Sequence, residues 1–318
     1  MVFKKLLGAL GIGGPSVDTV LHQDHVRPGG TVTGEVRIEG GSQDVVIERV
    51  ALGLVTRVET EHGDREGSAG VEFHQVDVSG RLELAASESR VLPFELAVPW
   101  ETPVTAVFGQ PMPGMTLGVR TELAVAKAVD KGDLDPLLVE PLPAQQRVLD
   151  AFGELGFQFK GADLEHGVLH GVAQRLPFFQ EIEFFPPEQH AGRINEVELT
   201  FVAGAEGLTV VLEADKRGGF LSSGQDVFGR YEFSHQDALE ADWTRLVADW
   251  LEQVAQRRGG MFGGHDGHHD HHGHDGHRGP GMGGVVAGAA LGAGAGIVGG
   301  MLIGEAVEEV FEGEEDEG

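Results

Sequence analysis

Residues 117–143 read LGVRTELAVAKAVDKGDLDPLLVEPLP, and this stretch decides how the rest of the chain is organised. It opens with apolar and polar side chains in alternation. That is the pattern of a half-buried β-strand, because successive side chains of a strand point to opposite faces of the sheet. One face of the predicted strand carries Val119, Thr121, Leu123 and Val125.

The second part of the stretch is rich in residues that form turns and extended connections. Aspartate, glycine and proline crowd residues 130–136, which predicts a break after the strand. Pro136, Pro141 and Pro143 then favour an extended chain, because proline fixes its own φ angle and disfavours the helical conformation of its predecessor. We interpret residues 117–143 as the last strand of one β domain, followed by a semi-rigid connector to a second.

The residues before the connector have the pattern of an all-β sandwich. Strand alternation is found within residues 16–60, 72–84 and 90–98, with turn-forming residues between these segments. Glu61–Gly70 is polar and glycine-rich, so we predict a loop there. Many short strands separated by turns are typical of a sandwich, which we assign to residues 1–135.

The residues after the connector mix strand and helix patterns. Residues 196–202 and 207–215 alternate like strands, whereas 144–155 and 238–257 have apolar residues at helical spacing. Ser234 and Asp237 are candidate caps of the later helix. Its apolar stripe, which we expect to face a core, consists of Leu239, Trp243, Leu246, Val247, Trp250, Leu251 and Val254. We predict a second β domain over residues 136–258 that ends in this helix.

Shorter segments lie at the two ends of the chain. Residues 1–14 have apolar residues on one helical face and then glycines, which predicts a short amphipathic helix. The C-terminal part divides by composition into a histidine- and glycine-rich linker (259–281), an apolar glycine-rich segment (282–304) and an acidic tail (305–318).

Composition excludes several classes of function. A formal net charge of −28 at pH 7 repels phosphate, so we expect no nucleic-acid partner and no charge-driven binding to anionic membranes. The chain has no cysteine, which excludes disulfides, thiolate metal sites and cysteine nucleophiles. No phosphate-binding loop or Gly-x-Ser-x-Gly elbow occurs, so we expect no catalytic residues and no required cofactor. We expect a cytoplasmic protein, with peripheral or tail-mediated membrane contact as the alternative.

The linker contains HDGHHDHHGHDGH at residues 265–277. Imidazole nitrogens and carboxylate oxygens suit Zn²⁺, Ni²⁺, Co²⁺ and Cu²⁺. Such a tract has no apolar residue to bury and does not fold by itself. It is either a metal-binding segment, a linker without a metal role in the cell, or a pH sensor whose histidines gain charge near pH 6.5. The candidate ligands are His265, Asp266, His268, His269, Asp270, His271, His272, His274, Asp275 and His277.

Glycine recurs at every fourth position of the apolar segment. In a helix these glycines form one stripe, which lets a second helix approach closely, and the segment is long enough to cross a bilayer. Such a glycine zipper would associate with a membrane or with a second copy of the chain. The alternative is a flexible tail, because glycine costs about 1 kcal/mol per helical position relative to alanine. The glycines are Gly284, Gly288, Gly292, Gly296, Gly300 and Gly304.

Several separated motifs occur in a characteristic order. They are LPFELAVPWETPVT (92–105), VRTELAVAKAVDKGDLDPLLVEP (119–141), RVLDAFGELGF (147–157), LPFFQEIEFFP (176–186) and LEADKRGGFLS (212–222). In this order they resemble the SpoOM family of sporulation-control proteins, over about residues 1–255. The resemblance implies an arrestin-like fold, in which two β-sandwiches are joined by a short connector. It also implies a non-enzymatic, regulatory role in bacterial development through contacts with other proteins.

The first hypothesis is therefore a regulatory scaffold whose partners are other proteins. A metal-binding or metal-buffering protein that uses the histidine tract is a second hypothesis, and an adaptor held at a membrane by the glycine zipper is a third. A hydrolase whose catalytic residues meet only in the folded second domain is a fourth.

Calorimetric titration of the full chain with Zn²⁺ or Ni²⁺ tests the tract. We expect binding that disappears when its seven histidines are changed to serine, because a hydroxyl is a poor ligand for these ions. If the substitutions leave the heat of metal binding unchanged, the tract is not a metal-binding site.

Overall fold

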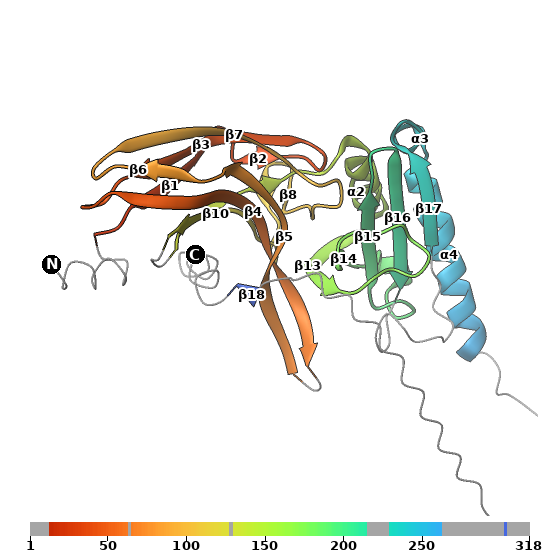
Figure 1. Ribbon diagram of the computed structural model, residues 1–318. Helices are drawn as coiled ribbons and strands as arrows, with labels where there is room; N and C mark the ends of the chain where they lie inside the picture. The colour runs from red at the N-terminus through yellow and green to blue at the C-terminus, as the bar shows by residue number, and fades with distance from the viewer. Residues whose placement is uncertain (1–12, 63–64, 127–129, 215–228, 263–301, 304–318) are drawn as a thin grey trace, which may run out of the picture.

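The computed structural model describes residues 13–62, 65–126, 130–214, 229–262 and 302–303. The predicted N-terminal helix, the histidine tract, the acidic tail and nearly all of the glycine-rich segment lie outside these residues. The chain is mostly β-strand with few helices, as predicted, and it has two halves (Figure 1).

The first half is a sandwich of two β layers with an apolar core between them. Two short strand pairs lie at its margin. One layer consists of β1 (Ser16–Leu21), β3 (Thr31–Glu39) and β7 (Ser89–Ala97). The other consists of β11 (Lys131–Pro136), β10 (Leu117–Val125), β4 (Val45–His62), β5 (Arg65–Ser79) and β6 (Leu82–Leu84). The short pairs are β2 (His25–Val26), β12 (Leu138–Val139), β8 (Ala106–Val107) and β9 (Gln110–Pro111).

Side-chain hydrogen bonds connect the two layers where β1 meets β10 and β11. The Thr19 hydroxyl lies 2.5 Å from the Thr121 hydroxyl, and the Thr19 amide donates to the Asp133 carboxylate at 2.7 Å. The predicted inward face of β10 is confirmed, since Val119, Thr121, Leu123 and Val125 are all buried.

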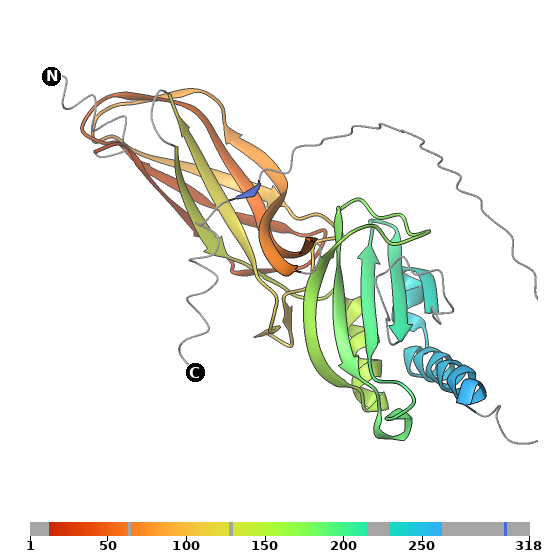
Figure 2. The same cartoon turned by 90° about the horizontal axis from the view of Figure 1, so that it is seen from below.

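The second half is one antiparallel sheet with helices on one face (Figures 1 and 2). Its strands follow one another in chain order: β13 (Gln158–His166), β14 (Phe178–Phe185), β15 (Val197–Ala203), β16 (Gly207–Ala214) and β17 (Gly229–Ser234). Helices α2 (Pro143–Leu155), α3 (His235–Glu240) and α4 (Trp243–Phe262) pack on it, and a 3-10 turn, η1 (Glu188–His190), follows β14. The expected second sandwich is not confirmed: within the described part of this half, helices take the place of a second sheet.

Two predicted loops are strands. Residues 131–136 form β11, which pairs with β10, and residues 61–70 belong to the β4–β5 hairpin. Both predictions were wrong for the same reason. These arms lie at the margin of the sandwich, so they do not need the apolar alternation by which buried strands are recognised.

The predicted helix 144–155 is confirmed as α2, whereas 238–257 divides into α3 and α4. Ser234 caps α3 by accepting a hydrogen bond from the Asp237 amide at 3.1 Å. The chain leaves the helical conformation at Ala241, and Trp243 then begins α4 with its indole N–H bonded to the Ala238 carbonyl at 2.7 Å. Leu239, expected in the apolar stripe, is 37 % exposed because it lies before this break.

The two halves share one continuous sheet through β4. Ile47–Thr56 of β4 pair with β10, and further along the same strand Glu59 pairs with Glu165 of β13 in parallel. The apolar side chains of β4 divide in the same way, since Leu52 and Leu54 lie in the first core and Val58 lies in the second.

Trp243→Ala is expected to lower the free energy of unfolding by about 3–5 kcal/mol, because it removes a fully buried aromatic side chain. Leu239→Ala on the neighbouring helix should cost less than about 1 kcal/mol, since that side chain is partly solvated. Chemical denaturation measures both values. Equal losses of stability would mean that Leu239 and Trp243 lie in one buried stripe, as the single helix predicted for residues 238–257 requires.

Candidate functional site

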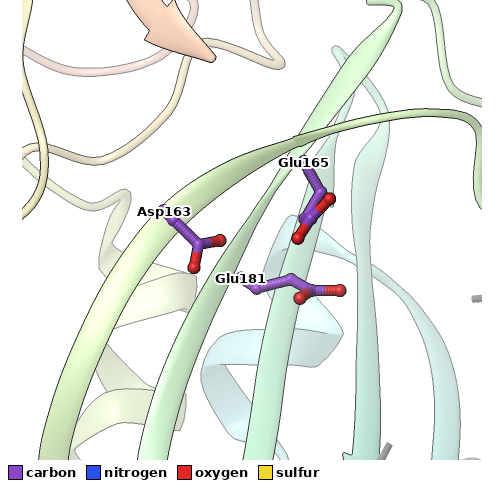
Figure 3. Close-up of side chains that lie close together, drawn as sticks. All are labelled: Asp163, Glu165 and Glu181. Carbon is purple, nitrogen blue, oxygen red and sulfur yellow. The ribbon is translucent and has the colours of Figure 1, made fainter. Parts of the chain in front are cut away.

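The face of the second sheet opposite its helices carries a cluster of three carboxylates. Asp163 and Glu165 lie on β13 and Glu181 lies on β14, with their side chains gathered on the same side of the sheet (Figure 3). Each offers a carboxylate oxygen within 4.8 Å of the others. We call these three residues the acidic cluster.

Strand alternation places these side chains on one face. On β13, Ala162 and Leu164 point into the core beneath the helices, so Asp163 and Glu165 between and after them point the other way. The register then brings Asp163 directly opposite Glu181. Like charges opposite each other destabilise a sheet, so the cluster has an energetic cost that packing elsewhere must offset.

Burial and the neighbouring charges both act on Asp163. Burial, followed by the negative charges of Glu181, Glu59, Glu183 and Glu165, raises the pKa of Asp163 to about 7. Within the described residues, its Oδ1 atom is buried without a hydrogen-bond partner. Asp163 therefore changes its charge near neutral pH, unlike an ordinary surface aspartate.

A lysine balances the next carboxylates along the same face. The Lys160 ammonium lies 2.7 Å from Glu196 and 3.3 Å from Glu183. Burial opposes the charge on Lys160, but the hydrogen bonds and charges of these two partners outweigh it and raise its pKa. The pKa of Glu183 is also raised, first by burial and then by Glu196. A positive charge, that of the Lys160 ammonium, therefore lies on the same sheet face as the acidic cluster, where it is paired with Glu183 and Glu196.

The chemistry of the acidic cluster is that of an acceptor site. Carboxylate oxygens are ligands for hard cations such as Ca²⁺ and Mg²⁺. The three side chains offer negative charge and hydrogen-bond acceptors, and they include neither a hydroxyl or thiol nucleophile nor an imidazole base. This composition suits the binding of a cation or of hydrogen-bond donors.

A second group of carboxylates lies in the first half. Burial, and then the charges of Asp133 and Asp18, raise the pKa of Asp135 to about 7. Asp133 is the same residue that accepts the Thr19 amide between the sandwich layers. The layer contact therefore also lies beside a carboxyl group that titrates near neutral pH.

The junction between the halves is held by hydrogen bonds of one neutral side-chain amide and one carboxylate. The buried amide of Gln180 donates to the Val104 carbonyl at 2.7 Å and accepts the Val104 amide at 3.0 Å. Beside this pair, the Glu101 carboxylate accepts the backbone amides of Arg175 and Leu176 at 2.7 and 2.9 Å. Trp100 stacks on the His235 ring, with centroids 5.4 Å apart. A pocket lies among these residues, and its lining includes Trp100, Glu101, Gln174 and Gln180.

The site residues predicted from the sequence lie outside the described residues, so the fold does not place them. The acidic cluster was not predicted, although alternating acidic residues in GADLEH and FFQEIEFF were visible signals. The pairing of β13 with β14 brings the two segments together, and the sequence alone does not reveal that register. None of the helices in the described ranges is both long and apolar enough to cross a membrane.

A mainly β protein with a sandwich half and a helix-covered half, joined through one shared strand, is the class that this fold defines. A family model described as SpoOM protein matches residues 3–218, and the chain belongs to this sporulation-control family. It is 34 % identical to the sporulation-control protein spo0M of Bacillus subtilis (strain 168) over 216 residues, which cover 68 % of this chain and 81 % of that protein. The crystal structure of Spo0M from Bacillus subtilis matches with a TM-score of 0.68 at 29 % identity, covering 76 % of this chain and all of that one.

Asp163→Asn should reduce the pH dependence of stability. A carboxyl group with a raised pKa binds its proton more tightly in the folded state, so its stabilising contribution is present below about pH 4 and is lost as pH rises toward about 7. We expect the asparagine variant to be more stable than the parent at pH 8 by about 1 kcal/mol, since solvent screens a half-buried charge.

Denaturation midpoints from pH 4 to pH 8 measure this effect. Glu252→Gln on the exposed side of α4 is the matched control, and it should leave the slope unchanged because it removes a carboxylate on the helical face, away from the cluster. An Asp163→Asn variant with the parental slope would show that Asp163 is not the titrating group.

Proposed function

We propose that this chain is a non-enzymatic regulatory protein that controls bacterial development through contacts with other proteins. The observation that carries the proposal is its 34 % identity to a sporulation-control protein over 216 residues. The family model covers both the sandwich and most of the second sheet, so the likeness extends through both halves of the fold.

The geometry of the described residues supports a role in binding. The acidic cluster supplies charge and hydrogen-bond acceptors on a sheet face, and sheet edges supply backbone groups that a second chain can pair with. β4 links these surfaces, because it pairs with β10 in the first half and, at Glu59, with β13 in the second. We therefore assign the contacts to the sheet faces and edges.

Complementation tests this function. We expect expression of the full chain in a Bacillus subtilis strain that lacks its sporulation-control protein spo0M to move the sporulation frequency toward the parental value. The Trp243→Ala variant should restore less, because it lowers the fraction of folded protein. If the wild-type chain is folded and as abundant as the native protein, and sporulation nevertheless stays at the level of the deletion strain, the proposal is wrong.

A further inference from the structure

The outer edge of β5 is paired with a distant segment of the same chain. β5 is hydrogen-bonded to β4 along one edge. On its other edge lies β18 (Leu302–Ile303), antiparallel, with Leu302 opposite Val71 and Ile303 opposite Gly70. Figures 1 and 2 both show β18 beside β5, so the contact does not depend on the direction of view.

One short stretch of β5, between Glu66 and Glu72, lacks the charges and prolines that protect strand edges. Residues 68–71 read Ser-Ala-Gly-Val, without a charge or a proline. Two other edge strands carry such features: β7 has Pro93 at its centre, and β17 has the ion pair of Arg230 with Glu232. Proteins commonly use prolines and charges to stop a second chain from adding a strand, so residues 68–71 of the β5 edge are suited to strand addition.

The position of this edge in the fold also favours the binding of a partner strand. The pairing of β4 with β5 continues as far as His62 and Arg65, well beyond Leu54, where the first core ends along β4. Val71 packs against the second core, so the edge lies where the hairpin passes from one half to the other. A strand added here would extend the sheet that joins the two halves.

We propose that the β5 edge at residues 68–71 is a docking site for an extended aliphatic strand, and that Leu302–Ile303 of the chain's own tail is its resident occupant. The inference deepens the proposed function, on which it rests, by naming the surface through which the scaffold takes a protein partner. The partner segment resembles the occupant: two neighbouring aliphatic residues in a short apolar stretch bounded by glycines, as in GMLIG at 300–304.

The tail then regulates access to this surface. Backbone hydrogen bonds supply most of the affinity in strand addition, so any extended segment of suitable shape competes for the edge. β18 belongs to the same chain, so it competes with external strands at an effective concentration set by the length of chain between α4 and β18. External strands that bind weakly are therefore excluded from the edge. The β18 segment lies outside residues 3–218, which the family model matches.

Hydrogen exchange in the full chain tests the occupancy. The double variant Leu302→Pro/Ile303→Pro removes both amides of β18 and disrupts its pairing, so the amides of residues 68–71 that point toward β18 should exchange at least tenfold faster. Val285→Pro/Val286→Pro, an equal change at another apolar pair of the tail, is the matched control and should leave these amides unchanged. Unchanged exchange in the first variant would overturn the proposal.

A labelled peptide of residues 297–310 tests docking by fluorescence anisotropy. It should bind the Leu302→Pro/Ile303→Pro variant at least tenfold more tightly than the parent or the control variant. A further Ala69→Lys substitution in β5 should abolish the gain, because a lysine on an edge opposes strand addition.

Faster exchange without peptide binding would show that β18 only covers the edge, and self-association of the variant in place of peptide binding would show that the edge selects a second copy. Either result overturns the proposed docking site. Neither measurement involves sporulation, so each can fail or succeed independently of the complementation test.

Discussion

The backbone of β4 sets the constraint on which the rest of the structure depends. A strand in the interior of a sheet needs partners for its amides and carbonyls along both edges. β4 has 18 residues, whereas β10 beside it has 9, so β10 alone cannot satisfy that edge. β10 covers Ile47–Thr56 of this edge, and β13 meets it at the single pair of Glu59 with Glu165, which joins the sheet of the second half to β4. The other edge requires the long hairpin arm β5, whose own outer edge is then left for another segment to cover.

The same alternation that buries one face of the second sheet creates the carboxylates on the other. Once Ala162, Leu164 and Ile182 are committed to the core, the intervening acidic residues must share the opposite face. Their mutual repulsion and partial burial raise the pKa of Asp163, and the junction a few residues away uses the neutral Gln180 amide instead. The hydrogen bonds of the Gln180 amide do not depend on pH, because an amide side chain does not titrate.

The sequence predicted the elements that bury a regular apolar face. The inward residues of β10, the helix α2 and the Ser234 cap are where the pattern places them. The strands at 61–70 and 131–136 could not be found in this way, because hairpin arms at the margin are defined by their partners. The acidic cluster could not be predicted for the same reason, since only the register of β13 with β14 brings Asp163 opposite Glu181. Helix spacing at 144–155 and 238–257 was recognised, but spacing does not reveal that these helices occupy the layer where a second sheet was expected.

A pairing as short as that of β18 is suited to regulation because it is weak. Each intramolecular hydrogen bond contributes about 1 kcal/mol net, so a strand of two residues stabilises the covered edge by only a few kcal/mol before the cost of ordering the chain is subtracted. An edge covered by a long, fully paired strand would be closed permanently, and an uncovered edge of small residues would invite aggregation. A two-residue strand on a long tether lies between these limits: it shields the edge from weak encounters and gives way to a partner strand that makes a longer ladder.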